Sequence, residues 1–113
     1  MYRRYLNNDV VRSLAENIPM FHIYDDHEIK NNWDNKEEAP YPDAMKAWTE
    51  YVGNGNPQPV SSDVYYFTYQ VSEVGFFVLD TKRYRSPVKD SDGPGKTMIG
   101  SVQKAALFNW LEN

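Results

Sequence analysis

The sequence predicts an α/β fold. Residues with helical periodicity lie at both ends of the chain, and short β-prone and apolar runs lie between them. The 113 residues, 41% of them hydrophobic and 15% aromatic, are enough for one packed core. Only about three strands can be counted, which is few for an α/β sheet. Because the apolar faces of the predicted helices need more sheet than this, we expect the chain to be a portion of a longer enzyme domain.

The first half of the chain is predicted to contain two helices and one buried strand. Apolar residues at every fourth position predict a helix over Tyr5 to Asn17, which Pro19 ends. The short apolar run from Met20 to Tyr24 is typical of a buried strand that leads into a functional loop. A long polar loop follows over Glu28 to Pro42, and a second helix is predicted over Asp43 to Val52.

The second half is predicted to form a hairpin and a closing helix. Val64 to Val71 is rich in β-branched and aromatic residues, and Phe76 to Leu79 is a continuous apolar run. With Ser72 to Gly75 as the turn, the two segments predict an antiparallel hairpin whose second strand is the more buried. A loop rich in glycine, proline and aspartate spans Lys89 to Lys96, and helical periodicity returns over Gly100 to Asn113.

Composition excludes several classes of function. The formal net charge is -4 and no basic stripe is present, which argues against nucleic acid or an anionic membrane as the main partner. No segment is apolar for long enough to cross a membrane, and no signal peptide follows Met1. The chain has no cysteine, so any metal site must use oxygen and imidazole ligands, which suit calcium, magnesium, manganese, zinc or iron. Localisation and oligomeric state are left open.

The strongest candidate for a functional site is Asp25-Asp26-His27-Glu28, directly after the predicted strand. Adjacent carboxylates repel each other unless a cation or hydrogen-bond donors compensate their charge, and a metal ion does so directly. A histidine beside such a metal can hold a phosphate oxygen or protonate a leaving group, while Glu28 orients the imidazole. The alternative is a helix that begins with acidic residues and continues through Lys30. Spacing alone leaves both interpretations open.

Two further polar segments allow alternative interpretations. Asn31-Asn32-Trp33 offers amide oxygens to a hard cation, or it simply forms a turn. The segment Asp80 to Arg85 places basic side chains just after an apolar strand, where arginine suits binding of phosphate. The alternative there is a solvated loop with a structural ion pair from Asp80 to Arg83.

Three segments, in the same order along the chain, resemble the signatures of PhoD-like alkaline phosphatases. They are Ile23–Ile29 with Asn31–Trp33, Leu79–Ser86, and Lys96–Gly100 with Gln103, Trp110 and Leu111. Lys82 stands where the family usually has arginine. The resemblance extends from Pro19 to Leu111 and is far more specific than any one motif.

The resemblance implies a four-layer αββα metallophosphoesterase sandwich, of which residues 1–113 would be the central portion, with both flanks missing. It implies hydrolysis of phosphate monoesters or diesters, with a phosphoester as substrate. The expected cofactors are divalent or trivalent metal ions, with calcium and iron foremost. Upstream and downstream metal-binding motifs of the family would lie outside the chain, and so would the targeting segment of exported members.

The same resemblance assigns roles to individual residues. By analogy with the Asn-His-Glu motif of the wider metallophosphoesterase class, Asp26 takes a metal-ligand position and His27 the catalytic position that faces phosphate. Asp25 and Asn32 are further candidate metal ligands. The residues expected to support the site or bind substrate are Glu28, Arg83 and Arg85. The competing hypotheses are a truncated, inactive chain, an interaction module, and a domain that binds carbohydrate or protein through its tyrosines.

Overall fold

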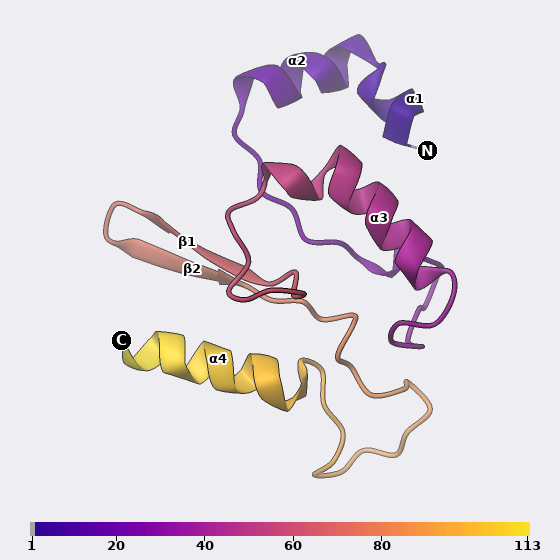
Figure 1. Ribbon diagram of the computed structural model, residues 1–113, viewed down its shortest axis with the longest axis vertical. Coiled ribbons are helices and arrows are strands. Elements are labelled where there is room, and N and C mark those ends of the chain that lie inside the picture. The colour runs from indigo at the N-terminus through magenta and orange to yellow at the C-terminus, as the bar shows by residue number, and fades with distance from the viewer. Residues whose placement is uncertain (1) are drawn as a thin grey trace.

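The computed structural model describes residues 2–113 and has a mixed α/β fold with a small two-stranded sheet. Its elements are α1 (Tyr2–Leu6), α2 (Asp9–Asn17), the 3-10 turn η1 (Asp26–Glu28), α3 (Tyr41–Tyr51), the 3-10 turn η2 (Gly53–Gly55), β1 (Phe67–Val71), β2 (Val74–Val78) and α4 (Gly100–Glu112). Helices α1 and α2 lie on one side of α3, and the hairpin lies between α3 and α4 (Figure 1). No helix within residues 2–113 combines enough length and apolar character to cross a bilayer.

The predicted first helix is divided into α1 and α2 by an asparagine cap. The side-chain oxygen of Asn8 accepts hydrogen bonds from the backbone N–H groups of Val10 and Val11, so a new helix begins after it. Helix α2 ends at Asn17, two residues before Pro19, as predicted. The apolar face that predicted this helix is largely exposed, with 69% of Val10 accessible to solvent.

The prediction of a strand over Met20 to Tyr24 is wrong. The segment joins no sheet within residues 2–113, where the sheet consists of β1 and β2 alone. Instead, the side-chain amide of Asn56 pairs with the backbone of His22. It accepts from the His22 N–H at 2.8 Å and donates to the His22 carbonyl at 2.6 Å. The amide therefore satisfies one residue of the segment in the way that a neighbouring strand would.

Helix α3 supplies most of the core. It begins two residues before the predicted start and ends one residue before the predicted end. The main cluster of buried hydrophobic residues consists of Tyr24, Trp33, Tyr41, Met45 and Trp48. The ring of Tyr24 meets the ring of Trp48 edge-on, with 5.6 Å between centroids. Tyr24 and Tyr41 thus belong to the core, whereas Tyr5 is 63% exposed, and binding of carbohydrate or protein through tyrosines stays a prediction.

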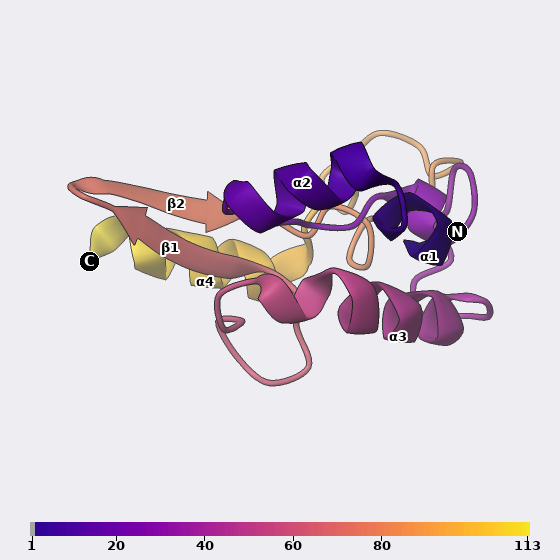
Figure 2. The ribbon, with the colours of Figure 1, turned by 90° about the horizontal axis from the view of Figure 1, so that it is seen from above.

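The hairpin is antiparallel, as predicted, with Phe67 opposite Val78 and Val71 opposite Val74. The expected burial is reversed: Phe67 of β1 is 1% exposed, whereas Phe76 of β2 is 39% exposed. The distal half of the hairpin extends beyond the core, so a continuous apolar run does not guarantee burial there. Figure 2 shows α4 running alongside the hairpin, and Trp110 of α4 meets Phe77 of β2 edge-on.

The closing helix begins at a glycine, as the sequence predicts. Gly100 has φ +69, and a Cβ atom at this position would lie 3.1 Å from the Cβ atom of Tyr84. A positive φ disfavours every L-residue with a side chain. The start of α4 therefore depends on glycine for its backbone conformation as well as for space.

Replacement of this glycine gives a first prediction. Gly100→Ala is expected to lower the free energy of unfolding by about 1–2 kcal/mol, because alanine must adopt the left-handed conformation. Urea unfolding measures the loss. The matched control is Gly95→Ala, since a Cβ atom at Gly95 meets nothing within 4 Å. A loss for Gly100→Ala no larger than that of the control would contradict the argument.

The fold leaves much apolar surface uncovered. The radius of gyration is 15.8 Å, whereas a compact chain of this length has about 13 Å. The accessible surface is 8323 Å², against about 6,400 Å² for a typical folded monomer of this mass. Exposed side chains include Leu14 of α2, Ile18 just after α2, and Phe108 and Leu111 of α4.

Candidate metal centre

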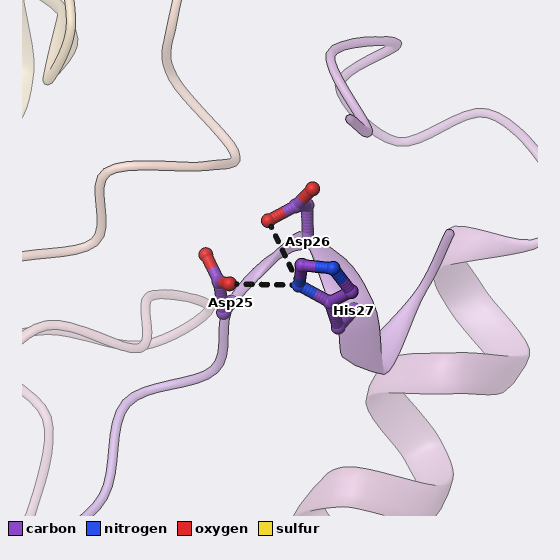
Figure 3. A group of neighbouring side chains, drawn as sticks. All are labelled: Asp25, Asp26 and His27. Carbon is purple, nitrogen blue, oxygen red and sulfur yellow. Dashed lines mark hydrogen bonds and ion pairs between the residues drawn. The ribbon is translucent and has the colours of Figure 1, made fainter. Parts of the chain in front are cut away.

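Three consecutive residues bring their polar atoms together at the end of the segment that follows α2. Asp25, Asp26 and His27 each offer one ligand atom, and these atoms lie within 4.8 Å of one another (Figure 3). The buried Tyr24 fixes the chain just before them, and the backbone then turns through η1. The local sequence therefore places two carboxylates and an imidazole on one short turn, as predicted.

Glu28 orders this turn. Its Oε2 accepts a hydrogen bond from the backbone N–H of Asp25 at 2.7 Å. This contact is typical of a capping box, so the helix-start interpretation is correct for the single turn Asp26–Glu28. The helix does not continue through Lys30. Within residues 2–113, the Glu28 carboxylate accepts from the backbone of Asp25 and makes no hydrogen bond to the imidazole of His27, contrary to the role predicted for it.

Asn32 contacts the cluster through its backbone. Its N–H donates to Oδ2 of Asp26, and its φ of 59 is one that asparagine adopts more readily than most residues. The turn-forming interpretation of this segment therefore has direct support. The proposed role of the Asn32 amide oxygen as a metal ligand stays a prediction.

His27 lies at the exposed edge of the cluster, with 68% of its side chain accessible. Its Nδ1 is 3.1 Å from Oδ2 of Asp25 and 3.5 Å from Oδ1 of Asp26. The hydrogen bond to Asp25, and then the charge of Asp26, raise the pKa of the imidazole. The two carboxylates thus favour the protonated form of His27 and hold its ring in place.

Lys82 joins the cluster from the segment after β2. Its Nζ lies 2.7 Å from Oδ1 of Asp25 and 3.1 Å from Oδ1 of Asp26. The hydrogen bond with Lys82, followed by that with His27, lowers the pKa of Asp25, and the Asp25 contact raises the pKa of Lys82. The sequence predicted basic side chains in this segment, with Lys82 in place of the family's arginine, but not the contact of Lys82 with Asp25 and Asp26.

The buried carboxylate of Asp80 holds the Lys82 segment in position. Its Oδ1 accepts from the N–H groups of Lys82 and Arg83, both at 3.0 Å, and its Oδ2 accepts from the Tyr24 hydroxyl at 2.7 Å. Burial, followed by the charge of Asp80, raises the pKa of Tyr24. The predicted ion pair between Asp80 and Arg83 is wrong, since Asp80 accepts from the Arg83 backbone.

The completely buried side chain of Gln103 connects Asp80 to α4. Its amide oxygen accepts from the Asp80 N–H and its amide nitrogen donates to the Asp80 carbonyl, both at 2.8 Å. Asp80 therefore links the η1 turn, the Lys82 segment and α4. This link explains why a glutamine occupies a fully buried position.

The two arginines that the sequence singled out engage other groups. The guanidinium of Arg83 pairs with Glu37 at 2.7 Å and with Asp63 at 3.2 Å. Arg85 lines a separate surface hollow with Ser86 and Thr97. No hydrogen bond or ion pair joins either guanidinium to the Asp25–His27 cluster within residues 2–113. The structure supports a role for Arg83 in tying two loops together.

The donor set suits a hard or borderline cation. Carboxylate oxygens and imidazole nitrogen are ligands for calcium, zinc and iron, and the Lys82 ammonium already lies against both carboxylates. Three ligands are fewer than the six to eight that calcium takes, so the cluster fits part of a coordination sphere.

Comparison with known proteins adds independent information. The family model described as PhoD-like phosphatase matches residues 1–113. Alkaline phosphatase D of Bacillus subtilis (strain 168) is 27% identical over 134 aligned positions, which cover 97% of this chain and 23% of that protein. The chain thus spans about a quarter of the length of this curated relative. No solved structure matches it significantly.

Proposed function

The chain belongs to the PhoD-like phosphatase family, and on this premise we propose that it carries part of the metal centre of a phosphoesterase. The substrates would be phosphate monoesters or diesters. The observation that carries the proposal is the convergence of Asp25, Asp26 and His27, whose ligand atoms lie within 4.8 Å of one another.

Asp26 and Asp25 would hold the metal ion, with calcium and iron the proposed metals. When bound, such an ion acts as a Lewis acid and lowers the pKa of coordinated water. Asp26 is 6% exposed, and the N–H of Asn32 orients its Oδ2. A ligand held in this way keeps its geometry without further ordering, which favours binding.

His27 would act on the phosphoryl group or the leaving group. Its Nδ1 faces Asp25, and most of the side chain is open to solvent, so a substrate can reach the ring. A protonated imidazole can donate a proton to a leaving-group oxygen or stabilise a negative phosphoryl oxygen. Asp25 would serve both as ligand and as the group that orients this imidazole.

We further propose that residues 1–113 are the central portion of a four-layer αββα phosphatase domain whose flanks complete it. Two observations support this. The chain covers 23% of the length of alkaline phosphatase D, and its accessible surface of 8323 Å² is large for its mass. The exposed apolar faces of α2 and α4 would pack against the rest of such a domain. The alternative, an inactive truncated chain or an interaction module, predicts no dependence on flanking sequence.

Hydrolysis of p-nitrophenyl phosphate and bis(p-nitrophenyl) phosphate tests the proposed function. We expect no turnover by the 113-residue chain alone, because Asp25 and Asp26 supply only part of a metal coordination sphere. A polypeptide extended at both ends with the flanking gene sequence should turn over substrate, lose activity with a chelator and regain it with metal.

The outcomes separate the two parts of the proposal. Robust metal-stimulated turnover by the 113-residue chain would contradict the central-portion assignment. Turnover of the extended polypeptide that a chelator leaves unchanged would contradict the metal centre. An extended polypeptide without activity would favour the truncated, inactive chain.

A further inference from the structure

We propose that Lys82 competes with the metal ion for Asp25 and Asp26, and thereby sets the metal affinity of the cluster. The inference rests on the proposed metal centre. It assigns to this lysine the role of an internal cation that occupies the carboxylates when no metal is bound and leaves them when a metal binds.

The oxygen atoms of the two carboxylates are divided among different partners. Oδ2 of Asp25 contacts Nδ1 of His27, and Oδ2 of Asp26 accepts from the Asn32 N–H. Both Oδ1 atoms contact Nζ of Lys82, and Oδ1 of Asp26 also lies 3.5 Å from Nδ1 of His27. A metal ion that binds either Oδ1 atom therefore displaces the ammonium from it.

Charge makes the competition strong. One ammonium offsets part of the charge of two carboxylates, so the pair attracts a metal ion less strongly than it would without Lys82. A divalent ion bound to the same two carboxylates would also repel the Lys82 ammonium. Because only 17% of the Lys82 side chain is exposed, water screens this repulsion less than it does for a surface lysine.

The position of Lys82 is built into the fold. Its N–H donates to Asp80, which is fully buried and is held by Tyr24 and Gln103. The four-carbon stem of the lysine then reaches Asp25 and Asp26 from a fixed origin. Its ammonium can move away while its backbone stays in place, which is what a displaceable cation requires.

Calorimetric titration of the chain with Mn²⁺ or Ca²⁺ alone tests the inference. Lys82→Met keeps the apolar stem and removes the charge, and it should bind the metal about tenfold more tightly than the wild type. Lys82→Arg keeps the charge and should stay within about threefold of the wild type. Lys96→Met is the matched control, because Lys96 pairs with the exposed Asp92 in a distant loop, and it should leave the affinity unchanged.

A second measurement uses the wild-type chain, so it does not depend on how a variant folds. Acetylation of lysine amines with acetic anhydride, followed by mass spectrometry, reports how accessible each Nζ is. Lys82 should be modified slowly without metal and severalfold faster with saturating metal. Lys96 should react at the same rate under both conditions.

Each outcome has a definite meaning. Equal metal affinity of wild type and Lys82→Met would overturn the competition, and so would a Lys82→Arg variant that binds as tightly as Lys82→Met. If Asp26→Asn abolished binding in that same experiment, the proposed metal centre would still stand. Absence of metal binding in every variant would overturn both the competition and the metal centre in this chain.

Discussion

His27→Ala is expected to lower kcat of the extended phosphatase by about 10²- to 10⁴-fold, with a much smaller change in KM. The imidazole lies at the exposed edge of the cluster, where a substrate can reach it, and its Nδ1 lies 3.1 Å from Asp25 and 3.5 Å from Asp26. Its interaction with a leaving-group oxygen strengthens as negative charge develops. Removing it therefore affects the transition state more than the bound substrate.

Steady-state kinetics with both p-nitrophenyl esters measure this effect. His22→Ala is the matched control, because it removes the other of the two histidines. His22 contacts Asn56 through its backbone, which the substitution keeps. Since the His27 side chain is 68% exposed, added imidazole should restore part of the activity of His27→Ala. It should leave the activity of His22→Ala unchanged. Equal kcat in the wild type and His27→Ala would remove His27 from the mechanism.

The parts of the fold that sequence predicted are those that local patterns determine. The hairpin and α4 have strong periodicity and clear turn residues, and both form within a residue or two of the predicted bounds, except at the start of β1. The predicted strand over Met20 to Tyr24 fails because a strand is defined by its hydrogen-bonded partner, and the segment pairs with no strand within residues 2–113. The prediction that β2 is the more buried strand is also wrong, because burial depends on which other elements cover the strand.

The candidate site divides in the same way. Asp25, Asp26 and His27 are neighbours in sequence, so their convergence could be foreseen. Lys82 lies 56 residues from Asp26, and that contact depends on the tertiary position of the β2 segment. One signal was available: Lys82 lies shortly after the predicted second strand, at the position where the resembled family has arginine. Arg83, which carries the more obvious anion-binding group, instead neutralises two loop carboxylates.

Asp80→Ala is expected to destabilise the chain by about 3–5 kcal/mol, the largest effect on stability that we predict. The carboxylate is 0% exposed and accepts hydrogen bonds from the Tyr24 hydroxyl and from two backbone N–H groups. Alanine leaves these donors without an acceptor, and each unsatisfied buried donor costs about 1–3 kcal/mol. Such a loss is a large share of the roughly 5–15 kcal/mol that stabilises a domain.

Urea unfolding followed by tryptophan fluorescence reports this loss, because Trp33 and Trp48 belong to the buried core. Asp90→Ala, in an exposed loop, is the control and should change the free energy of unfolding by less than about 0.5 kcal/mol. Tyr24→Phe should lower the free energy of unfolding by about 1.5–3 kcal/mol, because it removes the hydrogen bond from the Tyr24 hydroxyl to the Asp80 carboxylate.

The comparison of these variants distinguishes a structural carboxylate from a metal ligand. Asp80 already has three donors, so it stabilises the fold without any cation, and the loss in Asp80→Ala should be the same with and without a chelator. A loss that appeared only with metal present would instead make Asp80 part of the metal centre. A free energy of unfolding equal to that of Asp90→Ala would mean that the fold does not depend on the hydrogen bonds that the Asp80 carboxylate accepts from Tyr24, Lys82 and Arg83.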